Sequence, residues 1–175
     1  DDARPVAIIS ADAGMRSGKV VPYKHLLDEA ISLSSHKPAK VLMVNRGLAD
    51  LAPVPGRDVD YASERARVID AQVPCEWVDS THPSYILYTS GTTGKPKGVQ
   101  RDTAGYAVAL AASMKHIYMG NPGETYFSTS DIGWVVGHSY IIYGPLINGM
   151  ATIMYEGCRS VPTPASGGAL SLIHI

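Results

Sequence analysis

The sequence predicts an α/β fold in which repeated strand and helix units build a mainly parallel sheet. Short apolar stretches of strand length alternate with longer stretches that have helical spacing, which is the pattern of βαβ units. The chain has 175 residues, with 45% hydrophobic and 18% charged residues. This length and composition are typical of a globular domain with one sizeable core.

The first half of the chain contains two expected strands, two expected helices and a loop. Val6–Ile9 is an expected strand, and the continuous apolar run Val41–Val44 is typical of a buried strand. Tyr23–Ser34 has helical spacing, Pro53–Gly56 is a loop, and Asp60–Ala71 is a polar helix. The apolar residues expected on the inner side of the first helix are Leu26, Leu27, Ala30, Ile31 and Leu33.

Three further elements are expected up to residue 118. Trp77-Val78 and Tyr85–Tyr88 are β-rich stretches on either side of a turn at His82-Pro83. Thr103–Tyr118 is rich in alanine and predicts a helix.

The last expected elements are a strand at Thr125–Ser128, a helix at Gly137–Ile147 and a strand at Ala151–Tyr155. They overlap a stretch, Ile132–Tyr155, that contains no Asp, Glu, Lys or Arg and is long enough to span a membrane. Its proline, glycines and polar side chains divide it into shorter pieces. We therefore interpret it as buried core and expect no membrane partner.

Charge and cysteine content exclude several classes of function. The formal net charge is −1 and no long run of one sign occurs, so we expect no nucleic-acid partner. Cys75 and Cys158 lie far apart, and the six histidines are scattered, so we expect neither a disulfide framework nor a metal site made by this chain. Reduced thiols and the lack of a signal peptide favour a cytoplasmic location, or the mitochondrial matrix in a eukaryote.

Residues 88–99 read Tyr-Thr-Ser-Gly-Thr-Thr-Gly-Lys-Pro-Lys-Gly-Val and are the most informative segment. Glycines let a backbone approach a ligand closely, and amides, hydroxyls and ammonium groups suit phosphate oxygens. The pattern is not that of a Walker A loop, because Thr89 replaces its first glycine and Pro96 follows Lys95. A flexible linker is the plain alternative. A linker has no need of these side chains directly after a strand, so we favour a triphosphate-binding loop.

A second informative segment reads Asp131-Ile-Gly-Trp-Val-Val-Gly-His-Ser-Tyr140, followed by Ile-Ile-Tyr-Gly-Pro-Leu146. Taken alone it is typical of core, with His138 as a satisfied buried histidine. Together and in this order, the two segments resemble the motifs of the short-chain acyl-CoA synthetases, a branch of the adenylate-forming (AMP-binding) superfamily. The resemblance covers roughly residues 5–157 and implies part of the large N-terminal domain of such an enzyme. Val135-Val136 favours propionate as the acid, because acetyl-CoA synthetases commonly have Val-Thr there.

The resemblance implies a reaction in two steps. A small carboxylate attacks the α-phosphorus of ATP, which is bound with Mg²⁺, and the coenzyme A thiol then displaces AMP from the acyl-adenylate. Lys95 and His138 are the implied catalytic residues. The implied acyl pocket is formed by Trp134, Val135, Val136 and Gly137. The implied phosphate-binding residues are Thr89, Ser90, Gly91, Thr92, Thr93, Gly94, Lys95 and Lys97.

Two regions are expected along the chain. Residues 1–157 form a partial AMP-binding domain, and residues 158–175 depart from the family. This Pro/Ser/Gly-rich tail ends in Leu-Ser-Leu-Ile-His-Ile, and we expect either a cloning, sequencing or truncation artefact or a loop that enters another strand. The ribose-binding aspartate and the catalytic lysine of the family's C-terminal domain are missing from the sequence. We therefore expect an internal fragment that is inactive by itself.

Three other functions stay open. One is an acetyl-CoA synthetase fragment, and another is a phosphate-binding fragment without catalytic activity. The third is a hydrolase that uses Ser90, His138 and Asp131, although Ser90 lacks the Gly-x-Ser-x-Gly elbow of such enzymes.

Overall fold

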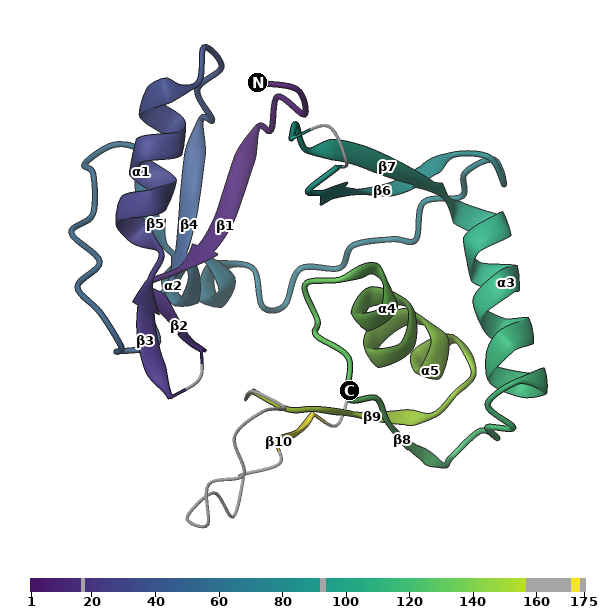
Figure 1. The fold of residues 1–175 in the computed structure, drawn as a ribbon. Coiled ribbons are helices and arrows are strands. Elements are labelled where there is room, and N and C mark those ends of the chain that lie inside the picture. Colours follow the sequence, from purple (N-terminus) through teal and green to yellow (C-terminus); the bar gives the residue numbers. More distant parts are fainter. Residues whose placement is uncertain (17, 92–93, 157–170, 174–175) are drawn as a thin grey trace. The chain divides into compact units, whose positions relative to one another are not determined.

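The computed structural model describes residues 1–16, 18–91, 94–156 and 171–173, which belong to two compact units (Figure 1). Unit 1 consists of Asp1–Pro74 together with Glu156, and unit 2 consists of Cys75–Tyr155 together with residues 171–173. Most of the tail expected at residues 158–175 lies outside the described residues.

Unit 1 is built on a parallel sheet with the strand order β1-β4-β5. Helix α1 connects towards β4, as the alternation of strands and helices predicted, and an antiparallel hairpin of β2 and β3 precedes it. The elements are β1 (Ala7–Ala11), β2 (Ala13–Arg16), β3 (Lys19–Pro22), α1 (Lys24–Leu33), β4 (Lys40–Val44), β5 (Asp58–Asp60) and α2 (Tyr61–Arg67). The polar helix α2 is shorter than the expected Asp60–Ala71, and Asp60 is its N-cap.

The core of unit 1 lies between α1 and the sheet. Val41 and Met43 on β4 are buried, as the apolar run predicted, and Ile31 of α1 packs against them. Leu27 also joins this core, but Leu26 and Leu33 are 50% and 79% exposed. The prediction that both lie on the inner side of the helix is therefore wrong, because the sheet of unit 1 contacts a narrower stripe of α1.

Charged side chains reinforce the contact between α1 and β5. Lys24 is only 4% exposed; its Nζ lies 3.1 Å from the Asp58 carboxylate and also pairs with Asp28. Arg57 bridges the same two carboxylates, with its Nε 2.6 Å from Asp58. Burial raises the pKa of Asp58, but hydrogen bonds from Arg57, the Val54 amide and Lys24 outweigh it and lower the pKa to about 2.

Asp12, directly after β1, organises the loops at the carboxyl ends of β1 and β4. Its side chain is fully buried and accepts hydrogen bonds from the backbone amides of Ala13, Arg46, Leu48 and Ala49 at 2.7–3.1 Å. Burial raises the pKa of Asp12, and the four donors together lower it to about 2. The carboxylate thus accepts the hydrogen bonds that these four amides would otherwise donate to water.

The first strands of unit 2, β6 and β7, form an antiparallel hairpin that leads into α3. A helical segment of α4, η1 and α5 then connects the parallel strands β8 and β9. The elements are β6 (Pro83–Thr89), β7 (Lys97–Asp102), α3 (Thr103–His116), β8 (Thr125–Phe127), α4 (Val135–Gly137), η1 (His138–Tyr143), α5 (Gly144–Ile147), β9 (Ala151–Met154) and β10 (Ser171–Ile173).

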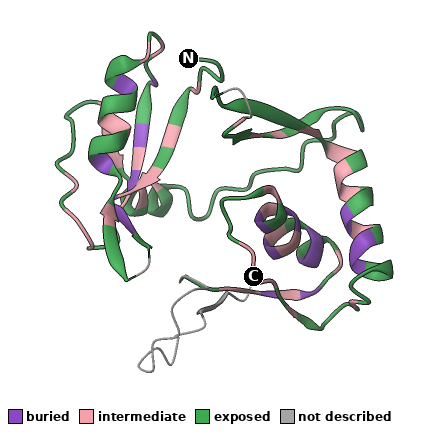
Figure 2. Ribbon diagram, viewed as in Figure 1, coloured by how far each residue is buried: buried purple, intermediate pink, exposed green. Residues whose placement is uncertain are grey.

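The buried residues of unit 2 concentrate on the helical segment and on the C-terminal half of α3 (Figure 2). Leu110, Ser113 and Met114 form the buried face of α3, which packs against α5. Asp102 begins α3 as its N-cap and accepts a hydrogen bond from the Gly105 amide at 3.2 Å. The expected helices of this half are thus present.

Two predictions in unit 2 need correction. Trp77-Val78 is not a strand; Trp77 is 93% exposed, and an apolar pair without a pairing partner does not form a ladder. The helix expected at Gly137–Ile147 begins at Val135 and contains the π-helical stretch η1. No helix among the described residues combines the length and apolar character needed to cross a bilayer.

Candidate functional site

The glycine-rich segment is the connection of the β6–β7 hairpin. The last register pairs are Tyr88 with Gly98 and Thr89 with Lys97, so residues 90–96 join the two strands. The pairing of β6 with β7 holds both ends of this connection in place. Figure 2 shows that the hairpin is largely exposed.

Two glycines give this loop its shape. Gly91 and Gly94 have φ angles of 63° and 79°, in the region that glycine adopts at low cost. A Cβ on Gly91 would lie 2.4 Å from the carbonyl oxygen of Lys95, so the loop folds back on itself at this point. A Cβ on Gly94 would meet nothing within 4 Å.

The other candidate phosphate ligands surround these glycines. Thr89, Ser90, Lys95 and Lys97 are exposed, and their hydroxyl and ammonium groups are therefore available to a ligand. Thr92 and Thr93, also predicted to bind phosphate, lie outside the described residues. The described loop offers exposed hydroxyls, positive charges and a tightly turned backbone, a combination suited to a polyanion.

The second motif forms a compact turn before α4. The Asp131 carboxylate accepts a hydrogen bond from the Gly133 amide at 2.8 Å, and its carbonyl accepts one from Trp134 at 3.1 Å. A Cβ on Gly137 would lie 2.1 Å from the Asp131 carbonyl oxygen, so only glycine permits this packing. Gly137 therefore shapes the backbone of the motif.

The four residues predicted to form an acyl pocket differ in exposure. Trp134 and Val136 are 65% and 48% exposed, so a ligand can reach both side chains. Val135 is half-buried and Gly137 is buried. Trp134 is the N-cap of α4 and has an extended backbone.

His138 belongs to an aromatic cluster that the sequence did not reveal. Its ring lies 5.7 Å from that of Tyr85 on β6, measured between centroids. Tyr85 also contacts Tyr143 at 5.8 Å and Tyr106 on α3 at 5.5 Å. Burial and the neighbouring Tyr106 raise the pKa of Tyr85 to about 12, so its hydroxyl remains protonated at neutral pH. The cluster joins β6, α3 and the helical segment.

This cluster connects the two motifs. Tyr85 contacts His138 and lies four residues before Thr89, which at the rise of a β-strand is roughly 13 Å. The same strand therefore carries a contact of the second motif at one point and the start of the glycine-rich loop at its end. The available signal for Tyr85 was its place, with Leu87, at alternate positions of a strand-like apolar run.

The hydrolase arrangement is not assembled. In the described part of the chain no hydrogen bond joins Ser90, His138 and Asp131, and the Asp131 side chain bonds to Gly133 instead. Ser90 lies in the exposed hairpin connection. The described residues also contain no group of three or more His, Cys, Asp or Glu that could hold a metal ion.

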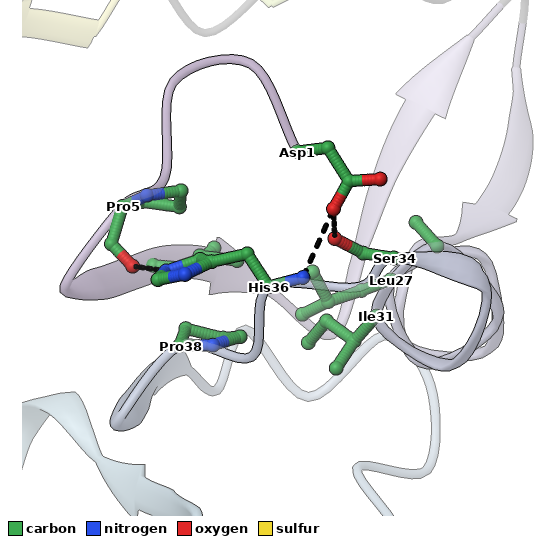
Figure 3. Close-up of a pocket in the computed structure, with 9 residues that line it drawn as sticks. Asp1, Pro5, Leu27, Ile31, Ser34, His36 and Pro38 are labelled. Atoms are coloured by element: carbon green, nitrogen blue, oxygen red, sulfur yellow. Dashed lines mark hydrogen bonds between the residues drawn. The ribbon is translucent and has the colours of Figure 1, made fainter.

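Unit 1 contains an apolar hollow that neither of the two motifs lines. It has a volume of about 170 Å³ and is lined by apolar side chains that include Ile8, Leu27 and Ile31 (Figure 3). Asp1 lies at its rim and accepts hydrogen bonds from the hydroxyl of Ser34 and the amide of His36. None of the residues predicted to bind ligand lines this hollow.

Comparison with known proteins agrees with the resemblance to the adenylate-forming family. Residues 1–166 match the model of a family described as "AMP-binding enzyme". The chain is 64% identical over 162 residues to Propionate--CoA ligase of Escherichia coli (strain K12), which is 93% of this chain and 26% of that protein. It is 49% identical over 168 residues to "Acyl-CoA synthetase short-chain family member 3, mitochondrial" of Homo sapiens, 95% of this chain and 24% of that protein. The chain thus spans about a quarter of the length of these relatives.

Proposed function

This chain belongs to the AMP-binding enzyme family, and from that premise we propose that it is the phosphate-binding and acyl-binding part of a propionate–CoA ligase. The enzyme activates propionate with ATP and passes the propionyl group to coenzyme A. The exposed loop between β6 and β7 carries this proposal, because it combines hydroxyls, lysines and a tightly turned backbone. The 64% identity to a propionate–CoA ligase supports the choice of acid.

In the first step a propionate oxygen attacks the α-phosphorus of ATP, and pyrophosphate leaves. The loop holds the phosphates through Thr89, Ser90, Thr92 and Thr93 and through the amides of Gly91 and Gly94. Lys95 and Lys97 neutralise charge that grows on the leaving pyrophosphate, which is where a fixed donor accelerates a reaction most. Mg²⁺ arrives with the nucleotide, and we assign it no ligand from the described residues.

In the second step the thiol of coenzyme A attacks the acyl carbon, and AMP leaves with the electrons of the broken bond. Trp134, Val135, Val136 and Gly137 bind the propionyl chain through both steps. His138 adjoins the adenylate and orients its reacting end. The family relatives include proteins with "mitochondrial" in their names, and we place the activity in the cytoplasm or, in a eukaryote, in the mitochondrial matrix.

A segment exchange tests this function. In the E. coli propionate–CoA ligase, the matching 162-residue segment is replaced by that of this chain; we call the product the chimera. We expect propionate-dependent release of pyrophosphate and formation of propionyl-CoA. The unaltered E. coli enzyme is the positive control. A chimera that melts at the temperature of the control but releases no pyrophosphate would contradict the proposal, and a preference for acetate would reassign the acid.

A further inference from the structure

The π-helical stretch η1 is an unusual element in the middle of the second motif. The amide of Gly144 donates to the carbonyl of Ser139, five residues earlier. A Cβ on Gly144 would lie 2.7 Å from this same oxygen, so the wide turn depends on glycine. Wide turns of this kind occur mostly as single insertions in α-helices and are frequent at functional sites.

Three side-chain hydrogen bonds hold η1 in place. The Tyr106 hydroxyl and the Ser139 Oγ lie 2.7 Å apart, and the Tyr140 hydroxyl donates to the Ser113 Oγ at 3.1 Å. The Thr152 Oγ1 donates to the Ile141 carbonyl at 2.7 Å. Ser139 and Thr152 are each 6% exposed, so these groups have no ready substitute partner in water.

Tyr106 differs from the other two anchors because it also reaches the strand that leads to the phosphate loop. The Tyr85 hydroxyl donates to the Tyr106 hydroxyl at 3.1 Å, and the two rings meet edge to face. Tyr106 also contacts Tyr143 of η1, and the Arg101 guanidinium of β7 lies 5.7 Å above its ring. One side chain therefore contacts β6, β7 and η1.

We propose that Tyr106 is a positioning residue: the hydrogen-bonded series Tyr85–Tyr106–Ser139 sets the place of His138 and the acyl motif relative to the phosphate loop. The Tyr85 ring contacts the His138 ring, and Ser139 directly follows His138 in the chain. Without the Tyr106 hydroxyl, Tyr85 and Ser139 each lose a hydrogen bond. This inference rests on the proposed function and assigns Tyr106 to the binding of the acid substrate.

The test uses Tyr106→Phe in the chimera, with Tyr140→Phe as the matched control. Each change removes one hydroxyl that links α3 to η1, but only the Tyr106 hydroxyl also bonds to Tyr85, which contacts His138. We expect Tyr106→Phe to raise the KM for propionate roughly tenfold, the size of effect that a buried hydrogen bond produces. The KM for ATP should stay within about twofold. Both variants should lower Tm by similar amounts, because each loses one hydrogen bond between α3 and η1. Tyr140→Phe should leave the KM for propionate unchanged.

A double variant, Tyr106→Phe with Ser139→Ala, separates positioning from stability. It removes the buried hydroxyl that Tyr106→Phe leaves without a partner, so Tm should recover in part. The KM for propionate should remain raised, because the link to η1 is still missing. A KM that follows Tm through all three variants would overturn the inference and leave a purely structural role. An inactive chimera before any substitution would instead overturn the proposed function, and this inference with it.

Discussion

The carboxylate of Asp12 is the acceptor for four backbone amides and is fully buried. Its pKa of about 2 lies below the ordinary value of 3.8, so the folded state binds its proton less readily than the unfolded state does. The resulting stability is complete above about pH 4 and is lost as the pH falls towards 2. Asp12 therefore contributes to acid sensitivity of unit 1.

We expect Asp12→Asn to lower the Tm of the chimera by several degrees at pH 7, because an amide NH₂ would face backbone donors. The difference from the unaltered protein should shrink as the pH falls from about 4 to 2, where the native carboxylate is itself protonated. Thermal unfolding across this range measures both effects. Asp70→Asn, at an exposed carboxylate, is the control and should show no difference at any pH. A constant difference for Asp12→Asn would contradict the assignment.

Lys95 is expected to act on charge that develops during adenylation. In the chimera, Lys95→Ala should slow adenylate formation by roughly 100-fold or more, the cost of removing one such donor, about 3 to 4 kcal/mol. Binding of propionate should change less. Single-turnover measurement of adenylate and thioester formation separates the two steps. Lys115→Ala, at an exposed lysine in the last turn of α3, should leave both rates unchanged. Equal rates for the two variants would mean that the loop is a linker.

Val136 is 48% exposed and lies in the acyl motif. If it lines the pocket, Val136→Leu fills space used by the terminal methyl of propionate, and one methylene discriminates by about 1 to 3 kcal/mol. The propionate-to-acetate ratio of kcat/KM in the chimera should then fall roughly tenfold or more. Val136→Thr, nearly equal in volume, should change the ratio less. A fall in both activities together with Tm would place Val136 in the core, and an unchanged ratio would remove it from the pocket.

At the scale of elements, the loop between β6 and β7 depends unequally on its two described glycines. Gly91→Ala should reduce adenylation in the chimera far more than Gly94→Ala. Both substitutions place alanine at positive φ, at a cost of about 1 kcal/mol, but only the Cβ at residue 91 meets a carbonyl, at 2.4 Å. Pyrophosphate release by the two variants measures the difference. Equal losses would show that conformational strain alone matters.

The positions of five elements could be predicted closely from the sequence. β1, α1, β4, β6 and α3 lie within one or two residues of their expected bounds, because each has a continuous or periodic apolar pattern. β7 was missed, since Lys97–Asp102 is mostly exposed and its polar sequence has no alternation. β7 pairs with β6 through backbone hydrogen bonds, which require no apolar pattern. The same reasoning explains the missed hairpin of β2 and β3, whose second strand is mostly exposed.

The candidate site also has one part that could be predicted from the sequence and one part that could not. The two motifs could be recognised because each is contiguous in the sequence, whereas the roles assigned to Lys95 and His138 within them are still predictions. Tyr85, Tyr106 and Ser139 come from three elements, and their hydrogen bonds depend on how those elements pack. The wide turn of η1 has no local pattern either, because it depends on a close approach between Gly144 and Ser139. Contacts across elements were therefore beyond what sequence spacing could predict.

At the scale of the whole molecule, we expect the 175-residue chain alone to release no pyrophosphate from ATP and propionate. Lys95 and Lys97 are exposed to water, where a charge pair at 4 Å is worth only about 1 kcal/mol. The chain also spans 26% of the length of the E. coli relative. Incubation with radiolabelled ATP, propionate and magnesium tests this, with the chimera as control. Release at about 1 per second or faster would contradict the expectation.

The pairing of Arg46 with Glu156 has a consequence for the synthesis of the protein. Both carboxylate oxygens of Glu156 accept hydrogen bonds from the Arg46 guanidinium, at 2.8 and 2.5 Å, across a separation of 110 residues. All of Cys75–Tyr155 is made between them. At roughly 5 to 20 residues per second, a ribosome needs about 6 to 20 seconds to synthesise the chain from Arg46 to Glu156. Arg46 of nascent unit 1 is therefore synthesised well before Glu156 can pair with it.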